Sequence, residues 1–235
     1  MKRPVVVIAC QVFQHLIEKY LSHNGEPAAP DAARVIYQDY GLHVFPNQLR
    51  QTLQAQLDSL PEPSLVILGY GLCGNGLRDI KAGVHTLVVP RTDDCIAILL
   101  GSYQAYQEAF TREPGTYYLT KGWLESGSNP LMEYQKLVVK YGAELAATVM
   151  DMQYQNYKRL AFVAHNQEDL AAYRAQALEV AAYCAQWGMV YEEIVGSEAY
   201  IEQLMAWAKQ PQDPGEAFVI IPAGGEITQA QFLRL

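Results

Sequence analysis

The sequence predicts an α/β protein in which helices cover both faces of a doubly wound, mostly parallel sheet. Short runs of β-branched and other apolar residues alternate along the chain with segments in which apolar residues recur every three or four positions. The first pattern is typical of strands, and the second is typical of amphipathic helices. Strict alternation of the two favours parallel pairing through right-handed crossovers, and strands that are apolar on both faces suit a sheet buried between helices.

Eight apolar runs are expected to form the strands. In chain order they are residues 5–9, 34–40, 65–70, 85–90, 116–120, 160–164, 190–195 and 217–222. The longest helical segment between them covers residues 131–157, and its Gly142 marks a kink or a close helix crossing. Asn166 and Ser197 precede acidic residues and are expected to start two later helices.

The chain is expected to fold as one compact unit over residues 1–235, or as two lobes over residues 1–128 and 129–235. Residues 24–31 and 125–130 are rich in turn-forming residues, and both segments are expected to be loops. The second segment marks the boundary in the two-lobe arrangement, where the first lobe carries the functional site.

Composition and charge narrow the class of protein. Half of the residues are hydrophobic, which is enough for a sizeable core, and the formal net charge of -8 argues against a nucleic-acid partner. No apolar run approaches the roughly 20 residues of a membrane-spanning helix, and the start does not resemble a signal peptide. A cytoplasmic location is therefore expected, in which the four cysteines are reduced thiols or metal ligands rather than disulfides.

Three of these cysteines are expected at the carboxyl ends of neighbouring strands. Cys10 closes the first strand, Cys73 follows the third, Cys95 follows the fourth, and His43 follows the second. Ligands of open parallel sheets bind at this edge. Thiolates with or without one imidazole suit zinc or an iron-sulfur cluster, and three fixed ligands leave a position open for substrate. The alternative is that the thiols are small core residues, which is the interpretation adopted for Cys184.

Other residues are expected to act beside the metal. Asp94, Arg91 and Tyr118 are predicted to orient the substrate, although Asp94 also suits a helix cap. A metal-free alternative is that Cys95, near a helix start and close to Arg91, is a reactive thiolate.

The loop that carries Cys73 also allows a different interpretation. Residues 69–74 match the G-x-G-x-x-G pattern after a strand, and two aspartates follow about 20 residues later, as a dinucleotide fingerprint requires. In this interpretation Gly71, Gly74 and Asn75 bind a nicotinamide or flavin cofactor, and the protein is a dinucleotide-binding oxidoreductase. The glycines are equally explained by a tight loop that approaches a bound group.

Three segments carry a resemblance to a known family. They are GYGLCGNG at residues 69–76, PRTDDCIAILLGS at 90–102 and PGTYYLTKGW at 114–123, with Leu42-His43 as a weaker match. In these segments the sequence resembles an uncharacterised bacterial and archaeal family, the domain of unknown function numbered 1638. The family often shows a His-Asp-Cys step where this chain has Asp93-Asp94-Cys95, so the role of that histidine is not transferred.

The resemblance implies an association with methylamine methyltransferases and corrinoid proteins, and hence one-carbon chemistry. We therefore expect a metal-dependent enzyme that acts on a small molecule, in which zinc activates a thiolate for methyl transfer or a cluster supplies electrons to a partner's corrinoid. The alternative is a non-catalytic accessory protein that carries a metal or corrinoid for a methyltransferase system. Trp187 and Trp207 are expected to be exposed and to indicate a homodimer.

Overall fold

The computed structural model describes residues 3–21 and 33–234. The turn-rich segment predicted at residues 24–31 lies outside this described part. The chain forms two compact units, the first made of Met1–Tyr103 with Glu198–Leu235 and the second made of Gln104–Ser197. The boundary expected between residues 128 and 129 falls inside the second unit.

All eight predicted strands are present, with ends that differ from the prediction by two residues at most. They are β1 (Val5–Cys10), β2 (Arg34–Gln38), β3 (Leu65–Gly69), β4 (Thr86–Pro90), β5 (Thr116–Thr120), β6 (Arg159–Ala164), β7 (Val190–Val195) and β8 (Phe218–Ile221). The apolar runs therefore located the strands correctly.

Helices fill most of the intervals between the strands. The α-helices are α1 (Gln14–Leu21), α2 (Pro46–Asp58), α3 (Ile96–Leu100), α4 (Tyr103–Arg112), α5 (Lys121–Glu125), α6 (Pro130–Tyr141), α7 (Ala143–Tyr154), α8 (Gln167–Cys184) and α9 (Ala199–Lys209). Short 3-10 turns are η1 (Gln11–Phe13), η2 (Tyr40–Val44), η3 (Ala185–Trp187) and η4 (Gln229–Gln231). The alternating order confirms the α/β class.

The first unit contains a five-stranded sheet in the order β2-β1-β3-β4-β8. β1, β2, β3 and β4 pair in parallel and β8 runs antiparallel to β4, which agrees with the prediction of a mostly parallel sheet. An antiparallel edge strand is common on parallel sheets. Its direction depends on where the preceding segment enters the sheet, and an apolar run carries no information about that.

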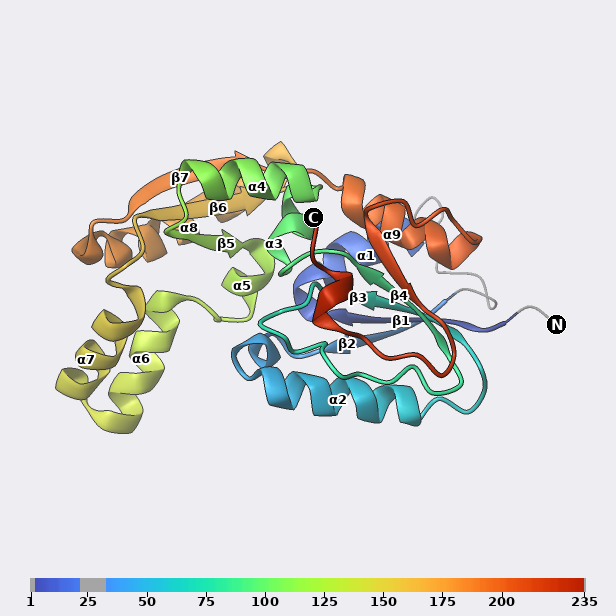
Figure 1. The fold of residues 1–235 in the computed structure, drawn as a ribbon. Helices are drawn as coiled ribbons and strands as arrows, with labels where there is room; N and C mark the ends of the chain where they lie inside the picture. The colour runs from blue at the N-terminus through green and yellow to red at the C-terminus, as the bar shows by residue number, and fades with distance from the viewer. Residues whose placement is uncertain (1–2, 22–32, 235) are drawn as a thin grey trace. The chain divides into compact units, whose positions relative to one another are not determined.

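Helices cover both faces of this sheet. Figure 1 shows α2 on one face and α1 with α9 on the other. Helix α2 buries Leu49, Leu53 and Leu57 at 1% exposure or less, and β1, β3 and β4 are buried along nearly their whole length. Burial of each such leucine stabilises the unit by about 1.5–3 kcal/mol, so the first unit has a substantial core beneath its sheet.

The second unit has its own sheet, in which β5, β6 and β7 are parallel. The long helix predicted over residues 131–157 is two helices, α6 and α7. Gly142 ends the first of them with φ +84°, a conformation that glycine adopts without strain. The cap predicted at Asn166 is confirmed, because its side chain accepts a hydrogen bond from the Asp169 N–H at 2.7 Å, and α9 begins shortly after Ser197.

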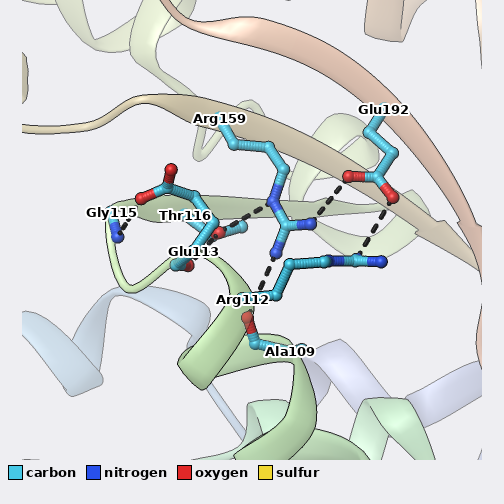
Figure 2. A network of polar contacts seen from close by, with 7 residues as sticks. All are labelled: Ala109, Arg112, Glu113, Gly115, Thr116, Arg159 and Glu192. Carbon is cyan, nitrogen blue, oxygen red and sulfur yellow. Dashed lines mark hydrogen bonds and ion pairs between the residues drawn. The ribbon is translucent and has the colours of Figure 1, made fainter.

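A buried arginine joins the amino-terminal ends of the strands in this second sheet. Arg159, at the start of β6 and 6% exposed, donates to Thr116 Oγ1 at 2.9 Å and to Glu192 Oε2 at 2.7 Å (Figure 2). Arg112 binds the other oxygen of the same carboxylate at 3.2 Å. The network ties α4, β5, β6 and β7 together at the edge opposite to the usual ligand edge, so its role is structural.

The tryptophans expected at the surface are not free surface residues. Trp207 is 6% exposed and packs against Phe218, so that expectation is wrong. Trp187 is half-buried, and its Nε1 donates to Asp151 Oδ1 at 2.8 Å. Cys184 is fully buried, as expected for a core residue. No helix in the described part of the chain is long and apolar enough to span a membrane.

Candidate functional site

The predicted cysteines lie at the carboxyl edge of the first sheet. Cys10 is the last residue of β1, Cys73 lies in the loop after β3, and Cys95 precedes α3 after β4. β1 has β2 on one side and β3 on the other, so the chain reverses its direction of winding between β1 and β3. Parallel sheets bind ligands at such a switch point, and Cys10 and Cys73 flank it.

Backbone hydrogen bonds hold the loops of Cys73 and Cys95 against each other. The Leu72 N–H donates to Thr92 O at 2.8 Å, and the Cys73 N–H donates to Asp93 O at 2.9 Å. Gly71 is required at this contact, because a Cβ there would lie 2.4 Å from Asp94 O. The close approach of the two loops therefore depends on the first glycine after the strand.

The turn that presents Cys73 is strained. Cys73, Gly74 and Asn75 have φ angles of +48°, +61° and +67°, so three successive residues adopt the left-handed conformation. This conformation costs a non-glycine residue about 1–2 kcal/mol. Such strain persists only where the surrounding structure imposes it, and it is concentrated at functional sites.

The three thiols act on one another electrostatically. Burial is the largest cause that raises the pKa of each, to about 11 for Cys10 and further for Cys73 and Cys95. The charge of Cys10 raises the pKa of Cys73 and Cys95 further, and Cys73 does the same to Cys95. Cys95 retains some exposed surface as a residue, but its thiol is deep enough to be desolvated. The thiols are therefore neutral at neutral pH unless a cation binds.

Nearby carboxylates add to this negative potential. Asp94 raises the pKa of Cys73 and Cys95, and Asp39 raises the pKa of Cys10. Asp39 caps η2 through the Gly41 N–H at 2.7 Å, and the sequence patterns did not single it out. A bound cation would be stabilised by all of these groups.

Backbone N–H groups are directed at the sulfurs. Val12 donates to Cys10, while both Gly71 and Cys95 donate to Cys73, and each of these hydrogen bonds lowers the pKa of the accepting thiol. Hydrogen bonds to sulfur stabilise thiolates and tune cluster potentials. The backbone N–H groups therefore favour the thiolate form of these cysteines, whereas burial without a cation favours the neutral thiol.

Tyr70 also belongs to the site and was not predicted from the sequence. It follows β3 directly and is 3% exposed, and burial raises the pKa of its phenol, as do the charges of Cys10, Cys73 and Cys95. Its hydroxyl has no hydrogen-bond partner among the residues that the structure describes, and neither does the buried Oδ1 of Asn75. Tyrosine after an apolar strand resembles an ordinary core residue, so no sequence pattern could identify it.

The residues predicted to orient substrate have other contacts. Asp94 Oδ1 accepts from the Ile96 N–H at 2.8 Å, close to the capping role foreseen as its alternative. Arg91 Nε donates to Gln231 O at 2.9 Å, so its guanidinium holds the carboxyl-terminal segment. Tyr118 lies in β5, in the second unit.

His43, the fourth predicted ligand, lies in η2, the short turn that follows β2. His43 is exposed on η2, and its Nδ1 lies 2.6 Å from Tyr40 O in its own turn. This is the local structural role that a histidine near a turn most often has. The other three predicted ligands lie at one edge of the first sheet, and their charges act on one another's pKa.

Two observations bear on what the site can bind. Among the described residues, no three His, Cys, Asp or Glu side chains are arranged so that they could hold a metal ion. The thiols thus affect one another's pKa without forming a metal-binding group as they stand. The glycine loop after β3 leads to β4 through residues 70–85 without forming a helix, whereas a dinucleotide fingerprint opens one.

Comparisons with known proteins identify the family. A family model described as "Protein of unknown function (DUF1638)" matches residues 37–205, which include Cys73 and Cys95. Searches of curated proteins and of solved structures gave no match. Because the family model covers more than half of the chain, this protein belongs to the DUF1638 family.

Proposed function

We propose that the protein binds a thiolate-ligated metal centre through Cys10, Cys73 and Cys95 and uses it in small-molecule, one-carbon metabolism. The observation that carries this proposal is that three thiols lie at the carboxyl edge of the first sheet, near the β1/β3 switch point. Cys10 raises the pKa of Cys73 and of Cys95, and Cys73 raises the pKa of Cys95. One buried cysteine is ordinary, but three from separate strand ends, with N–H donors directed at their sulfurs, have the composition of a soft-metal site.

The electrostatics support a cationic occupant. Desolvation keeps the thiols protonated, and the carboxylates of Asp39 and Asp94 make the surroundings more negative. A metal cation reverses both effects, because it offsets the cost of burying thiolate charge. The same groups would not activate a metal-free nucleophile, since a reactive cysteine needs a lowered pKa. The reactive-thiol interpretation of Cys95 is therefore disfavoured.

Zinc and an iron-sulfur cluster make different demands on the three thiols. A single zinc requires its ligands to converge at about 2.3 Å from one point, which these side chains do not do as they stand. In a cluster each thiolate binds its own iron, so the sulfurs need not converge. Three protein thiolates would leave one iron of a four-iron cluster open to a substrate.

The chain's own residues would then hold and shield the centre. The strained turn fixes Cys73, Gly71 allows its loop to approach the loop of Cys95, and burial excludes water from the sulfurs. When bound, a cluster supplies electrons or a Lewis-acidic iron. We further propose, on the family resemblance alone, that the centre serves methyl transfer together with corrinoid partners.

The test is analysis of protein purified without oxygen and without a metal-chelating tag. Iron and sulfide in similar amounts with a brown absorbance would identify a cluster, and about one zinc per chain with a colourless spectrum would identify zinc. Cys73→Ser should lose either centre while the chain stays folded. Wild-type protein without metal, or Cys73→Ser with its full complement, contradicts the proposal. Turnover with methyl donors then distinguishes an enzyme from an accessory carrier.

A further inference from the structure

Residues 226–234, drawn in red in Figure 1, form a strap that reaches the carboxyl end of β4. The backbone fixes the start of the strap, because Ile227 is fully buried and forms two hydrogen bonds of 2.9 Å with the loop that precedes β4. Within the described chain, no backbone hydrogen bond joins residues 228–234 to another segment. Phe232 is buried, but most of the other residues in this stretch are exposed. The far part of the strap is therefore held by fewer contacts than its start.

Two arginines clasp this far part of the strap to the loop after β4. Arg91, the first residue after β4, donates through Nε to Gln231 O at 2.9 Å and through a terminal nitrogen to Leu233 O at 2.5 Å. Arg234 donates in return to Arg91 O at 3.0 Å. The Arg234 guanidinium also lies over the ring of Tyr103, 4.0 Å from its centroid. The clasp therefore depends on Arg91 in both directions, through its side chain and through its carbonyl.

The loop that the clasp holds also supports the loop of Cys73. Thr92 and Asp93 follow Arg91 directly, and their carbonyls accept hydrogen bonds from the N–H groups of Leu72 and Cys73 at 2.8 and 2.9 Å. The loop after β4 is thus bonded to the strap and, through the next two residues, to the Cys73 loop. Ligands of parallel sheets bind at this edge. Release of the strap would remove one restraint on both cysteine-bearing loops.

We propose that the strap is a releasable lid, which opens at the Arg91 clasp while the sheet stays folded and so gives small molecules access to the loops of Cys73 and Cys95. Local opening occurs in the parts of a protein that have few buried contacts, and lids over binding sites are built from such parts. β1, β3 and β4 are buried along nearly their whole length, so they open far less often than the strap. The inference concerns access to this edge and does not require a metal there.

Hydrogen exchange of the full chain tests the clasp. Arg91→Met removes both donors to the strap, whereas Arg91→Lys keeps the charge but loses the fork that reaches two carbonyls. Arg3→Met is the matched control, because Arg3 donates to the start of the same strand, at Thr86 Oγ1 and 3.3 Å. In Arg91→Met, peptides from residues 226–234 and 70–76 should exchange about tenfold faster, the size of one hydrogen bond to a charged group. Arg91→Lys should be intermediate, and Arg3→Met should match wild type in both peptides.

Labelling with iodoacetamide, measured at each cysteine by mass spectrometry, tests access to the thiols. The full chain is labelled after a chelator has removed any bound metal, so that only the protein limits the reaction. Cys73 and Cys95 should react about tenfold faster in Arg91→Met than in wild type, in proportion to the opening of the strap. Cys184, which is buried in the second unit, should react at the same rate in both proteins.

Three results would overturn the proposal. Unchanged exchange of residues 226–234 in Arg91→Met would mean that the clasp does not hold the strap. Faster exchange of the strap with unchanged labelling of Cys73 and Cys95 would mean that the strap does not control access to these thiols. An equal increase in the exchange of β1 and β3 would mean that Arg91 supports the whole sheet and that no separate lid exists. None of these measurements depends on a metal centre, so their outcome is separate from that of the proposed function.

Discussion

Replacement of Cys73 by glycine should stabilise the metal-free first unit relative to replacement by alanine. Cys73 has φ +48°, and this left-handed conformation costs a residue with a Cβ about 1–2 kcal/mol. Glycine avoids that cost but loses about 0.5–1 kcal/mol through the greater freedom of its unfolded chain. The difference leaves Cys73→Gly more stable than Cys73→Ala by about 0–1.5 kcal/mol, with a midpoint of about 0.75 kcal/mol. Both variants lack the thiol, so neither should retain the metal centre.

The chain has two units, so the assay must report on the first alone. Hydrogen exchange in peptides from β1 and β3 gives the opening free energy of the sheet that carries the cysteines. The expected result is slower exchange in Cys73→Gly than in Cys73→Ala, with equal exchange in β6 of the second unit. Slower exchange in Cys73→Ala would refute the argument that the turn stores strain. Retained metal in both variants would refute the functional reason for that strain.

Further predictions concern pH, a glycine and the buried arginine. Metal affinity should rise with pH, and metal binding should release protons, because the pKa of each thiol is raised, to about 11 in Cys10. A metal affinity that does not change between pH 6 and pH 9 would contradict this prediction. The same raised pKa values stabilise the metal-free protein below the unfolded thiol pKa of about 8.5, and denaturation should show this contribution disappearing as the pH rises through about 11. Gly71→Ala places a Cβ 2.4 Å from Asp94 O, so it should lower the opening free energy of β3 by about 1–3 kcal/mol in hydrogen exchange and should also lower the metal content. Unchanged hydrogen exchange would show that the two loops separate freely. Arg159→Met should destabilise the second unit by about 2–3 kcal/mol, measured by hydrogen exchange of β6, because it removes the buried hydrogen bonds to Thr116 and Glu192. The metal content should not change; a change would mean that Arg159 has more than a structural role.

The sequence was sufficient to locate the strands and to bring the three cysteines to one edge. Buried parallel strands need continuous apolar runs, and these runs mark residues such as Val5–Cys10 and Leu65–Gly69 without competing signals. Parallel strands end at a common edge, so Cys10, Cys73 and Cys95 follow from strand order alone. The first prediction depends on the local apolar pattern, and the second depends only on the parallel order of the strands.

Features that depend on long-range contacts were not predictable in the same way. The antiparallel direction of β8 and the separation of β5 to β7 into a second sheet depend on how distant segments enter each sheet. Arg91 was predicted to orient the substrate, but its guanidinium donates a hydrogen bond to the backbone carbonyl of Gln231, which lies 140 residues away in the sequence. Tyr70 was overlooked because only the structure shows that its hydroxyl is buried, unpaired and subject to the charges of the thiols.

X-ray absorption at the edge of the bound metal tests the central claim most directly, because it reports which atoms touch the metal. Wild type and Cys184→Ala, whose cysteine is buried in the second unit, should show the same sulfur neighbours at about 2.3 Å. Cys10→Ser, Cys73→Ser and Cys95→Ser should each lose the centre or replace one of those sulfurs by a lighter atom. A metal with only nitrogen and oxygen neighbours in wild type, or an unchanged sulfur shell in all three variants, would contradict a centre held by these cysteines.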